Sequence, residues 1–236
     1  MTPEPSTSLD LPGGARWRLA PGVAGLLRCG VLVIGGVTAA ADGRCAAALA
    51  ARGEELRDAF AGRAPGGIPL LEEARRLYRS AGVDPTRTRP SSEALLRRAL
   101  KGQPLPQVNA AVDACNLASL SFLLPIGLYD LDRIEGDVEL RLGREGEEYP
   151  GIRKGAVHLA GRLGLFDARG PFGSPTSDSE RTSVSETAAR LLAVIFATAA
   201  YPADIMRANV DLLAGLMVRH CGGAVELAAV LPEPQP

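Results

Sequence analysis

The chain has 236 residues, of which 46% are hydrophobic and 22% are charged, and its formal net charge is −1. This composition excludes disorder for most of the chain and is ordinary for a soluble globular protein of one large domain or two closely joined halves. An aromatic content of 4% argues against the stacked aromatic surfaces that bind single-stranded nucleic acid. A net charge so close to zero also excludes binding to nucleic acid by bulk electrostatics.

Charge is distributed unevenly along the chain. Residues 72–101 contain eight arginines or lysines and four acids, whereas residues 130–148 contain eight acids and three arginines. A basic face beside an acidic one would suit a partner with a phosphate backbone, docked in one orientation. The alternative, that both runs are solvated helix and loop surfaces, stays open.

The cysteines and histidines show no metal-ligand spacing. The four cysteines form no C-x-x-C pair, and only one histidine is next to a cysteine, namely His220 beside Cys221. We therefore expect no metal site and no cofactor. The acidic, proline-rich start is unlike a signal peptide, and the longest apolar runs are too short to span a membrane. These features predict reduced thiols in a cytoplasmic protein without membrane association; they do not indicate an oligomeric state.

The first half of the chain reads as strands followed by helices. Residues 1–14 and 232–236 are rich in proline and predict flexible tails around one domain at 15–231. The apolar run Val31–Ile34 predicts a strand that is buried on both faces, within a strand-rich stretch from Trp17 to Val37. Periodicity and turn residues predict helices at Ala46–Phe60, Pro69–Ala81, Glu93–Lys101 (capped by Ser91 or Ser92) and Asn109–Phe122.

The second half reads more as sheet. Alternating residues predict strands at Asp137–Leu142, Gly146–Tyr149 and Gly155–Leu165, and Val225–Leu231 predicts a closing strand. The apolar run 189–198 fits a buried strand or a helix start, and Pro202–His220 fits a helix. Together the elements predict a mixed α/β (α+β) fold with helices packed on a mixed sheet.

Standard catalytic motifs are absent from the sequence. There is no G-x-G-x-x-G, no phosphate loop and no G-x-S-x-G elbow, and the two histidines fit structural roles better than catalytic ones. One candidate remains, the polar loop Gly170–Thr182, which supplies five hydroxyls, two carboxylates and one arginine. Long ordered loops are often functional, although a surface excursion without a ligand is the alternative.

Two linked motifs carry a family resemblance. VNAAVDACN (residues 108–116) is followed by PIGLYDLDRIEGD (residues 125–137), then by a strand and a Gly-Glu pair. This pattern resembles the B3/B4 editing domain of the bacterial phenylalanyl-tRNA synthetase β subunit, and in particular stand-alone B3/B4 proteins. The resemblance extends over roughly residues 70–198. It implies two halves that enclose a pocket for the aminoacylated 3′ end of tRNA, where a wrongly attached amino acid is hydrolysed.

The resemblance also implies roles for individual residues. The family's pocket dipeptide falls on Cys115-Asn116, its pocket histidine falls on Gly127, and the polar loop stands where the family has the segment that selects the substrate side chain. The catalytic candidates are therefore Asn116, Thr176 and Ser179. The substrate-binding candidates are Asn109, Cys115, Gly127, Gly173, Ser174, Asp178 and Arg181. The RNA-binding candidates are Arg89, Arg97, Arg98 and Lys101.

Three functions stay open at this point. The first is a trans-editing hydrolase that deacylates mischarged aminoacyl-tRNA, with tRNA and not DNA as its partner. The second is a non-catalytic module on the same fold that binds tRNA or an amino acid, which the missing histidine and the near-zero net charge favour. The third is a scaffold or adaptor for another protein.

Overall fold

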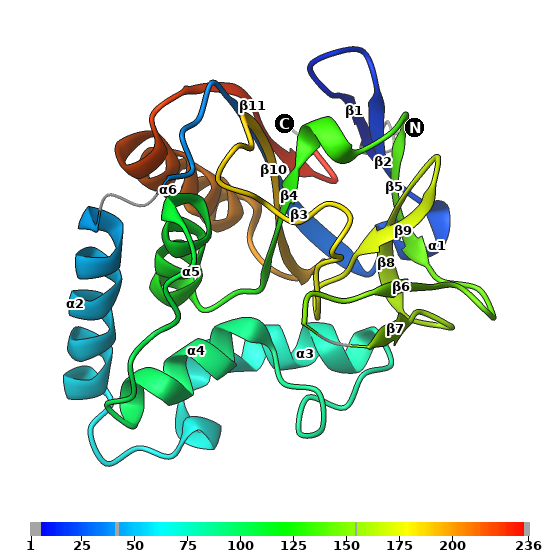
Figure 1. Cartoon of the computed structure of the whole chain (residues 1–236). Helices are drawn as coiled ribbons and strands as arrows, with labels where there is room; N and C mark the ends of the chain where they lie inside the picture. Colours follow the sequence, from blue (N-terminus) through cyan, green and yellow to red (C-terminus); the bar gives the residue numbers. More distant parts are fainter. Residues whose placement is uncertain (1–5, 41–42, 154, 234–236) are drawn as a thin grey trace.

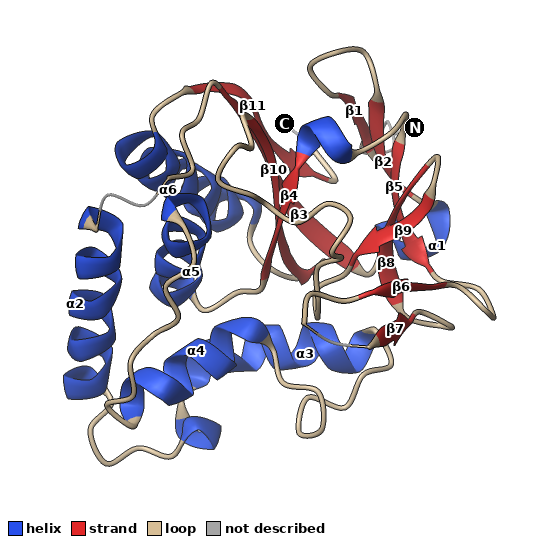
Figure 2. Cartoon of the chain, in the orientation of Figure 1, coloured by secondary structure: helices blue, strands red, loops and turns tan. Residues whose placement is uncertain are grey.

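The computed structural model describes residues 6–40, 43–153 and 155–233. Its longer helices lie to the left of and below two neighbouring sheets in the view of Figures 1 and 2. In these residues a four-stranded antiparallel sheet has the order β11-β3-β10-β4. Its strands are β3 (Leu27–Gly35), β4 (Ile126–Asp130), β10 (Arg190–Thr198) and β11 (Ala224–Leu231). The run at 189–198 is therefore a strand, and the strand predicted at Val31–Ile34 is present.

The central strands β3 and β10 are buried on both faces. Leu32 and Ile34 of β3 belong to the core beneath the helices, while Val31 and Val33 belong to a second core on the opposite face. The strand β10 alternates in the same way, since its odd-numbered residues face the helices and its even-numbered ones face away. A strand with two apolar faces reads as a continuous hydrophobic run, which is what the sequence has at both places.

Three helices cover one face of this sheet and its flank (Figure 2). The helix α5 (Ala110–Phe122) packs between α6 (Ala203–Cys221) and α2 (Arg44–Ala59). Leucines of α2, α4 (Ser91–Leu100) and α5 form a separate small core beneath them. The helix α3 (Glu72–Ser80) contacts β10. The remaining helical turns are α1 (Pro21–Ala24), η1 (Pro65–Gly67), η2 (Pro69–Leu71) and η3 (Leu131–Arg133).

The second sheet has five strands in the described residues, in the order β1-β2-β5-β8-β9. They are β1 (Ser8–Asp10), β2 (Arg16–Leu19), β5 (Val138–Leu142), β8 (Leu163–Asp167) and β9 (Gly170–Gly173). The pair β2–β5 is parallel and the others are antiparallel. A small hairpin of β6 (Glu148–Pro150) and β7 (Ala156–His158) lies beside this sheet. The mixed α/β fold with helices packed on a mixed sheet is thus confirmed.

Two predicted elements differ in detail. The helix α4 begins at Ser91 after Pro90, and no side chain of the described residues caps it, so the predicted serine cap is wrong. The extended φ and ψ of Pro90 lead directly into the helix, and the Pro90 carbonyl accepts the first hydrogen bond, from the amide of Ala94. The strand predicted at Gly155–Leu165 is two strands, β7 and β8, separated by a turn at Gly161 with φ +68°.

The start of the chain is more ordered than its composition suggests. Strand β1 lies inside the predicted tail 1–14, and Leu11 is buried, so the tail prediction is corrected for these residues. The proline and glycines that suggested a tail make the β1–β2 turn, which is closed by a hydrogen bond from the Leu11 amide to the Ala15 carbonyl (2.7 Å). Residues 1–5 and 234–236 of the predicted tails lie outside the described residues.

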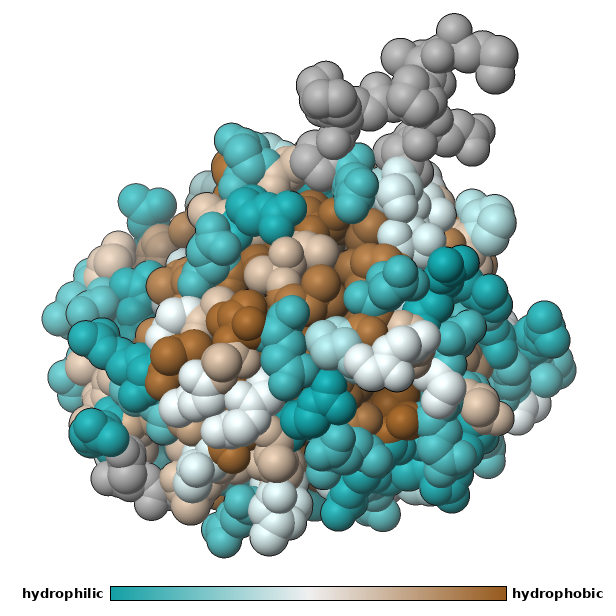
Figure 3. Space-filling view, turned by 90° about the horizontal axis from the view of Figure 1, so that it is seen from above, coloured by the Kyte–Doolittle hydropathy of each residue, from teal (hydrophilic) through white to brown (hydrophobic). Residues whose placement is uncertain are grey.

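Hydrophobic and basic surfaces lie on different sides of the molecule. Seen from above, hydrophobic residues gather in the middle of the face, with hydrophilic residues around them (Figure 3). The arginine-bearing helices α3 and α4 lie at the lower side in Figure 1. The described part of the chain holds no helix with the length and apolar character needed to cross a membrane.

Candidate functional site

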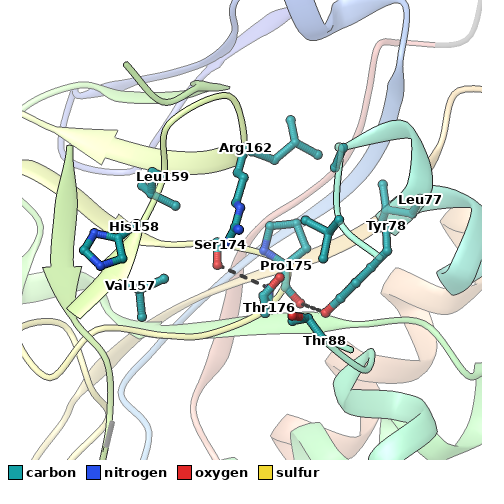
Figure 4. Close-up of a pocket in the computed structure, with 13 residues that line it drawn as sticks. Leu77, Tyr78, Thr88, Val157, His158, Leu159, Arg162, Ser174, Pro175 and Thr176 are labelled. Carbon is teal, nitrogen blue, oxygen red and sulfur yellow. Dashed lines mark hydrogen bonds between the residues drawn. The ribbon is translucent and has the colours of Figure 1, made fainter. Parts of the chain in front are cut away.

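A small cavity lies between the helical part of the chain and the strands of the second sheet (Figure 4). Its volume is about 30 Å³, which suits a water molecule and is too small for an amino-acid side chain. Tyr78 of α3 approaches from one side, and the chain around His158 approaches from the other. The lining residues are Leu77, Tyr78, Ala81, Val83, Thr88, Val157, His158, Leu159, Arg162, Leu163, Ser174, Pro175 and Thr176.

The cavity is closed by the turn of residues 174–178, which we call the site turn. The Oγ of Ser174 accepts hydrogen bonds from the amides of Thr176 (3.3 Å) and Ser177 (3.1 Å), so the serine side chain organises the turn. Two tyrosines hold the turn from outside. The Tyr78 hydroxyl donates to the Pro175 carbonyl (2.7 Å), and the Tyr149 hydroxyl lies 3.0 Å from the Ser174 Oγ.

A third tyrosine stands behind the site turn with its hydroxyl buried. Tyr129 of β4 is 0% exposed, and its ring meets Phe172 edge-on at 5.1 Å. Gly127 and Gly173 make room for the hydroxyl, because a Cβ at either position would lie 2.2 or 2.3 Å from it. Among the described residues the hydroxyl makes no well-aligned hydrogen bond, and the Asp178 carboxylate is the acceptor that interacts with it. A fully buried hydroxyl without a well-aligned partner calls for a structural or functional explanation.

The carboxylate of Asp178 acts on all three tyrosines. Burial raises the pKa of Tyr129, Tyr78 and Tyr149, and the nearby Asp178 carboxylate raises each further. Burial and the same carboxylate also raise the pKa of the Cys115 thiol on α5. These groups are therefore protonated at neutral pH, and each is able to donate a hydrogen bond. We call Tyr78, Tyr129 and Tyr149 the tyrosine cluster.

The structure brings several predicted site residues together. Ser174 and Thr176 line the cavity, and Asp178 and Cys115 interact with the tyrosine cluster. The two predicted glycines contribute space for Tyr129 and carry no side chain that could contact a substrate. Asn116 follows Cys115 on α5 and is half-buried, but it is not among the described residues that line the cavity.

Three other predicted site residues have structural contacts instead. Ser179 is 1% exposed, and its Oγ lies 3.0 Å from that of Thr182. Asn109 caps α5, since its side chain accepts from the Val112 amide at 2.9 Å. Arg181 forms a paired hydrogen bond to the Asp167 carboxylate, with both distances 2.9 Å. The contacts of these three side chains stabilise the fold, and we assign them no role in substrate binding or catalysis.

The predicted RNA-binding residues fall into two groups. Arg89 and Arg97 approach the carboxylate of Glu93, at 3.7 and 2.8 Å. Arg98 instead donates two hydrogen bonds to a backbone carbonyl of the loop that follows α4 (3.0 and 2.7 Å), and Lys101 is exposed at the end of that helix.

The tyrosine cluster is what sequence reasoning missed. Tyr129 lies in the motif at residues 125–137, and Tyr149 lies two residues after the Gly-Glu pair, so a signal was present. Tyr78 had only an inward place on its helix, which is equally typical of a core residue. Among the described residues, no group of three acidic, cysteine or histidine side chains could hold a metal ion.

Comparison with known proteins agrees with the family resemblance of the motifs at residues 108–116 and 125–137. The phenylalanine–tRNA ligase β subunit of Bartonella henselae is 29% identical over 109 residues, which are 43% of this chain and 13% of that protein. The same subunit of Bartonella quintana is 30% identical over 104 residues, 41% of this chain and 12% of that protein. The chain thus matches only about an eighth of the length of these relatives.

Comparison with solved structures gives a weaker similarity than comparison with the Bartonella sequences. A crystal structure of an N-terminal fragment of the phenylalanyl-tRNA synthetase β subunit from Pyrococcus horikoshii covers 54% of this chain and 47% of the fragment, with 14% identity and a TM-score of 0.42. That score is too low to carry an inference. The family model described as the B3/4 domain matches residues 73–212. Since this match covers more than half of the chain, the protein belongs to the B3/4 domain family.

Proposed function

We propose that this chain is a deacylase that hydrolyses the ester bond of mischarged aminoacyl-tRNA. Family membership and the phenylalanine–tRNA ligase relatives support tRNA as the partner. The observation that carries the proposal is the buried Tyr129 hydroxyl, which makes no well-aligned hydrogen bond among the described residues and interacts with the Asp178 carboxylate. A neutral donor next to a carboxylate is the combination that ester hydrolysis needs.

The proposed reaction assigns these two groups different roles. Asp178 orients a water molecule, whose oxygen bonds to the ester carbonyl carbon. The Tyr129 hydroxyl donates to the carbonyl oxygen as it gains negative charge. The attacking water gives a proton to the Asp178 carboxylate as its oxygen bonds to carbon. The bond from the carbonyl carbon to the ribose oxygen then breaks, and the ribose oxygen takes up that proton, which leaves the free amino acid and a ribose hydroxyl. Asn116, beside Cys115, is kept in the proposal as a second donor, and Thr176 as a contact to the substrate.

Substrate entry requires the site turn to move. The cavity of about 30 Å³ holds a water but no amino-acid side chain. The turn is held by the Tyr78 and Tyr149 hydroxyls (2.7 and 3.0 Å), and each such bond contributes only about 1 kcal/mol net. We expect binding energy from the tRNA to offset this cost.

A deacylation assay with a panel of mischarged tRNAs tests the proposal. We expect release of at least one amino acid faster than in buffer, and a loss of roughly 10²-fold or more in Asp178→Asn. Asp211→Asn, an exposed change on α6, is the matched control and should keep full activity. If no amino acid is released faster than in buffer, the proposed deacylase activity is refuted.

The second candidate is a binding module without catalysis. The small volume of the cavity favours it, as does the position of Ser179, which forms folding contacts and does not line the cavity. The two candidates differ in one measurement. A binding module would retain tRNA at equilibrium and protect its aminoacyl ester, whereas a deacylase would shorten the lifetime of that ester.

A further inference from the structure

A second cleft, which we call the arginine groove, is lined by residues of α3, of α4 and of the segments next to them. These two helices lie at the lower side of the molecule in Figure 1. Its volume is about 450 Å³, far larger than the cavity at the site turn. Four arginines and two glutamates line it: Arg75, Arg79, Arg89, Arg97, Glu72 and Glu93.

One buried carboxylate organises the groove. Glu93 is 2% exposed, and Arg75 donates to both of its oxygens at 2.8 and 2.9 Å. Arg97 donates through Nε at 2.8 Å, and the Nε of Arg89 lies 3.7 Å away. Burial alone would raise the pKa of Glu93, but the hydrogen bonds from Arg75 and Arg97 outweigh it and lower the pKa. Glu93 is therefore ionised at neutral pH.

Positive charge exceeds negative charge in the groove. Glu93 balances one of its three arginine neighbours, and Arg79 pairs with Glu72, so a net charge of about +2 is left. Arg89 and Arg97 keep 43% and 34% of their side chains exposed. A guanidinium has five donors in a planar fork that matches phosphate oxygens. Fixed arginines with spare donors favour phosphate over a carboxylate or a neutral ligand.

The groove and the cavity share the same two elements. Tyr78 of α3 and Thr88 of the joining segment face the cavity, whereas Arg75 and Arg89, on the same two elements, face the groove. The backbone of a nucleic-acid strand whose end lies at the site turn would therefore run along these arginines. We infer that the arginine groove binds the phosphodiester backbone of an RNA strand whose 3′ end enters the cavity. This inference rests on the proposed function for the identity of the strand.

The inference differs from what the sequence predicts for this face. Arg98 and Lys101 do not line the groove, while Arg75 and Arg79 do. Arg98 donates a hydrogen bond to the Pro104 carbonyl at 2.7 Å, so part of its guanidinium group faces the protein and not solvent. The two assignments can be separated by mutation.

Binding of uncharged tRNA, measured by fluorescence anisotropy over a series of salt concentrations, tests the inference. Arg89→Gln combined with Arg97→Gln should weaken binding about tenfold or more and lower the slope of log Kd against log salt by about 1 to 2. Arg89→Gln alone removes a side chain that makes no close hydrogen bond to Glu93, so it tests the groove if the double variant is unstable. Arg219→Gln on the exposed surface of α6 removes the same charge elsewhere and should bind like the unchanged protein.

Three results would contradict RNA binding by the groove. The first is an unchanged Kd and salt slope in folded Arg89→Gln. The second is a larger effect from Arg98→Gln with Lys101→Gln than from the groove pair. The third is displacement of tRNA by inorganic phosphate at an equal concentration of phosphate groups, which would indicate a simple anion site. Failure of the proposed deacylase activity can be distinguished from failure of the groove, because tRNA binding that depends on the groove can be measured without any ester hydrolysis.

Discussion

Tyr129 combines full burial with a hydroxyl that makes no well-aligned hydrogen bond among the described residues. Leaving such a group unsatisfied costs about 1–3 kcal/mol. A phenylalanine would fill the same space without this cost. The cost is understandable if the hydroxyl binds a substrate oxygen.

Tyr129→Phe should therefore separate stability from activity. We expect the free energy of unfolding to stay unchanged or to rise by about 1 kcal/mol, because an unsatisfied donor is removed. Deacylation should fall roughly 10²-fold, because the developing oxyanion loses a donor. Urea unfolding and single-turnover deacylation measure the two effects.

Tyr201→Phe is the matched control for this prediction. The Tyr201 hydroxyl accepts from Asn209 at 2.9 Å, away from the site turn. Its loss should cost about 1 kcal/mol of stability and leave deacylation unchanged. A Tyr129→Phe protein that is fully active, or that loses stability as Tyr201→Phe does, would show that the Tyr129 hydroxyl serves the fold alone.

The sequence predicts part of the site at this scale. Ser174, Thr176 and Asp178 follow from a polar loop that has a concentration of hydroxyls and carboxylates, and Cys115 follows from the motif. Ser179 looks identical in sequence to its neighbours, yet it faces inward to Thr182. Which hydroxyl of a loop points to a cavity depends on the backbone turn, and residue type alone does not encode that.

At the scale of elements, strands β4 and β9 contact each other where the Tyr129 ring packs against Phe172. The hydroxyl fits only because both facing positions are glycine. Gly127 was predicted to stand where the family has a pocket histidine. In this chain the space is taken by the tyrosine two residues later on the same face of β4.

Gly127→Ala should destabilise the protein by about 1–3 kcal/mol, because the new methyl group would lie 2.2 Å from the Tyr129 hydroxyl. Adding Tyr129→Phe should restore part of the loss, since it removes the atom in closest contact. Thermal unfolding of both variants measures this coupling. Gly25→Ala, where nothing lies within 4 Å of the added Cβ, is the control. Equal destabilisation with and without Tyr129→Phe would contradict the proposed packing.

Helices and buried strands are predicted well from the sequence because their signals are local. Four of the long helices follow from apolar periodicity, and β3 follows from an uninterrupted apolar run. The short strands do not. β9 lies in a stretch of glycine and proline that predicts a loop, and it forms only because β8 offers it a pairing edge. Such strands are determined by their neighbours, and their own residues carry little signal.

At the scale of the whole molecule, the net charge of −1 conceals a local excess of positive charge on the lower side. Bulk electrostatics therefore says little about nucleic-acid binding in this chain. Three arginines ordered around one buried glutamate form a surface that composition alone does not reveal. The sequence shows the excess of arginine between residues 72 and 101, but pairing with Glu93 decides which of them remain available.

The four-stranded sheet also links the two main cores. The same strands, β3 and β10, supply one face to the core beneath α5 and α6 and the other face to the core around Trp17. Loss of packing on one face removes support from the strands that form the other. We therefore expect both cores to unfold in a single transition.

Leu213→Ala tests this coupling, because Leu213 of α6 is 0% exposed in the core beneath the helices, while the single tryptophan, Trp17, reports the other core. We expect a loss of about 2–5 kcal/mol. The transition seen by Trp17 fluorescence should shift together with the helical signal in circular dichroism. Leu212→Ala, next to it and 42% exposed, should change stability by no more than about 0.5 kcal/mol. If the helical transition shifts in Leu213→Ala while the Trp17 transition stays in place, the cores unfold independently and the shared sheet does not couple them.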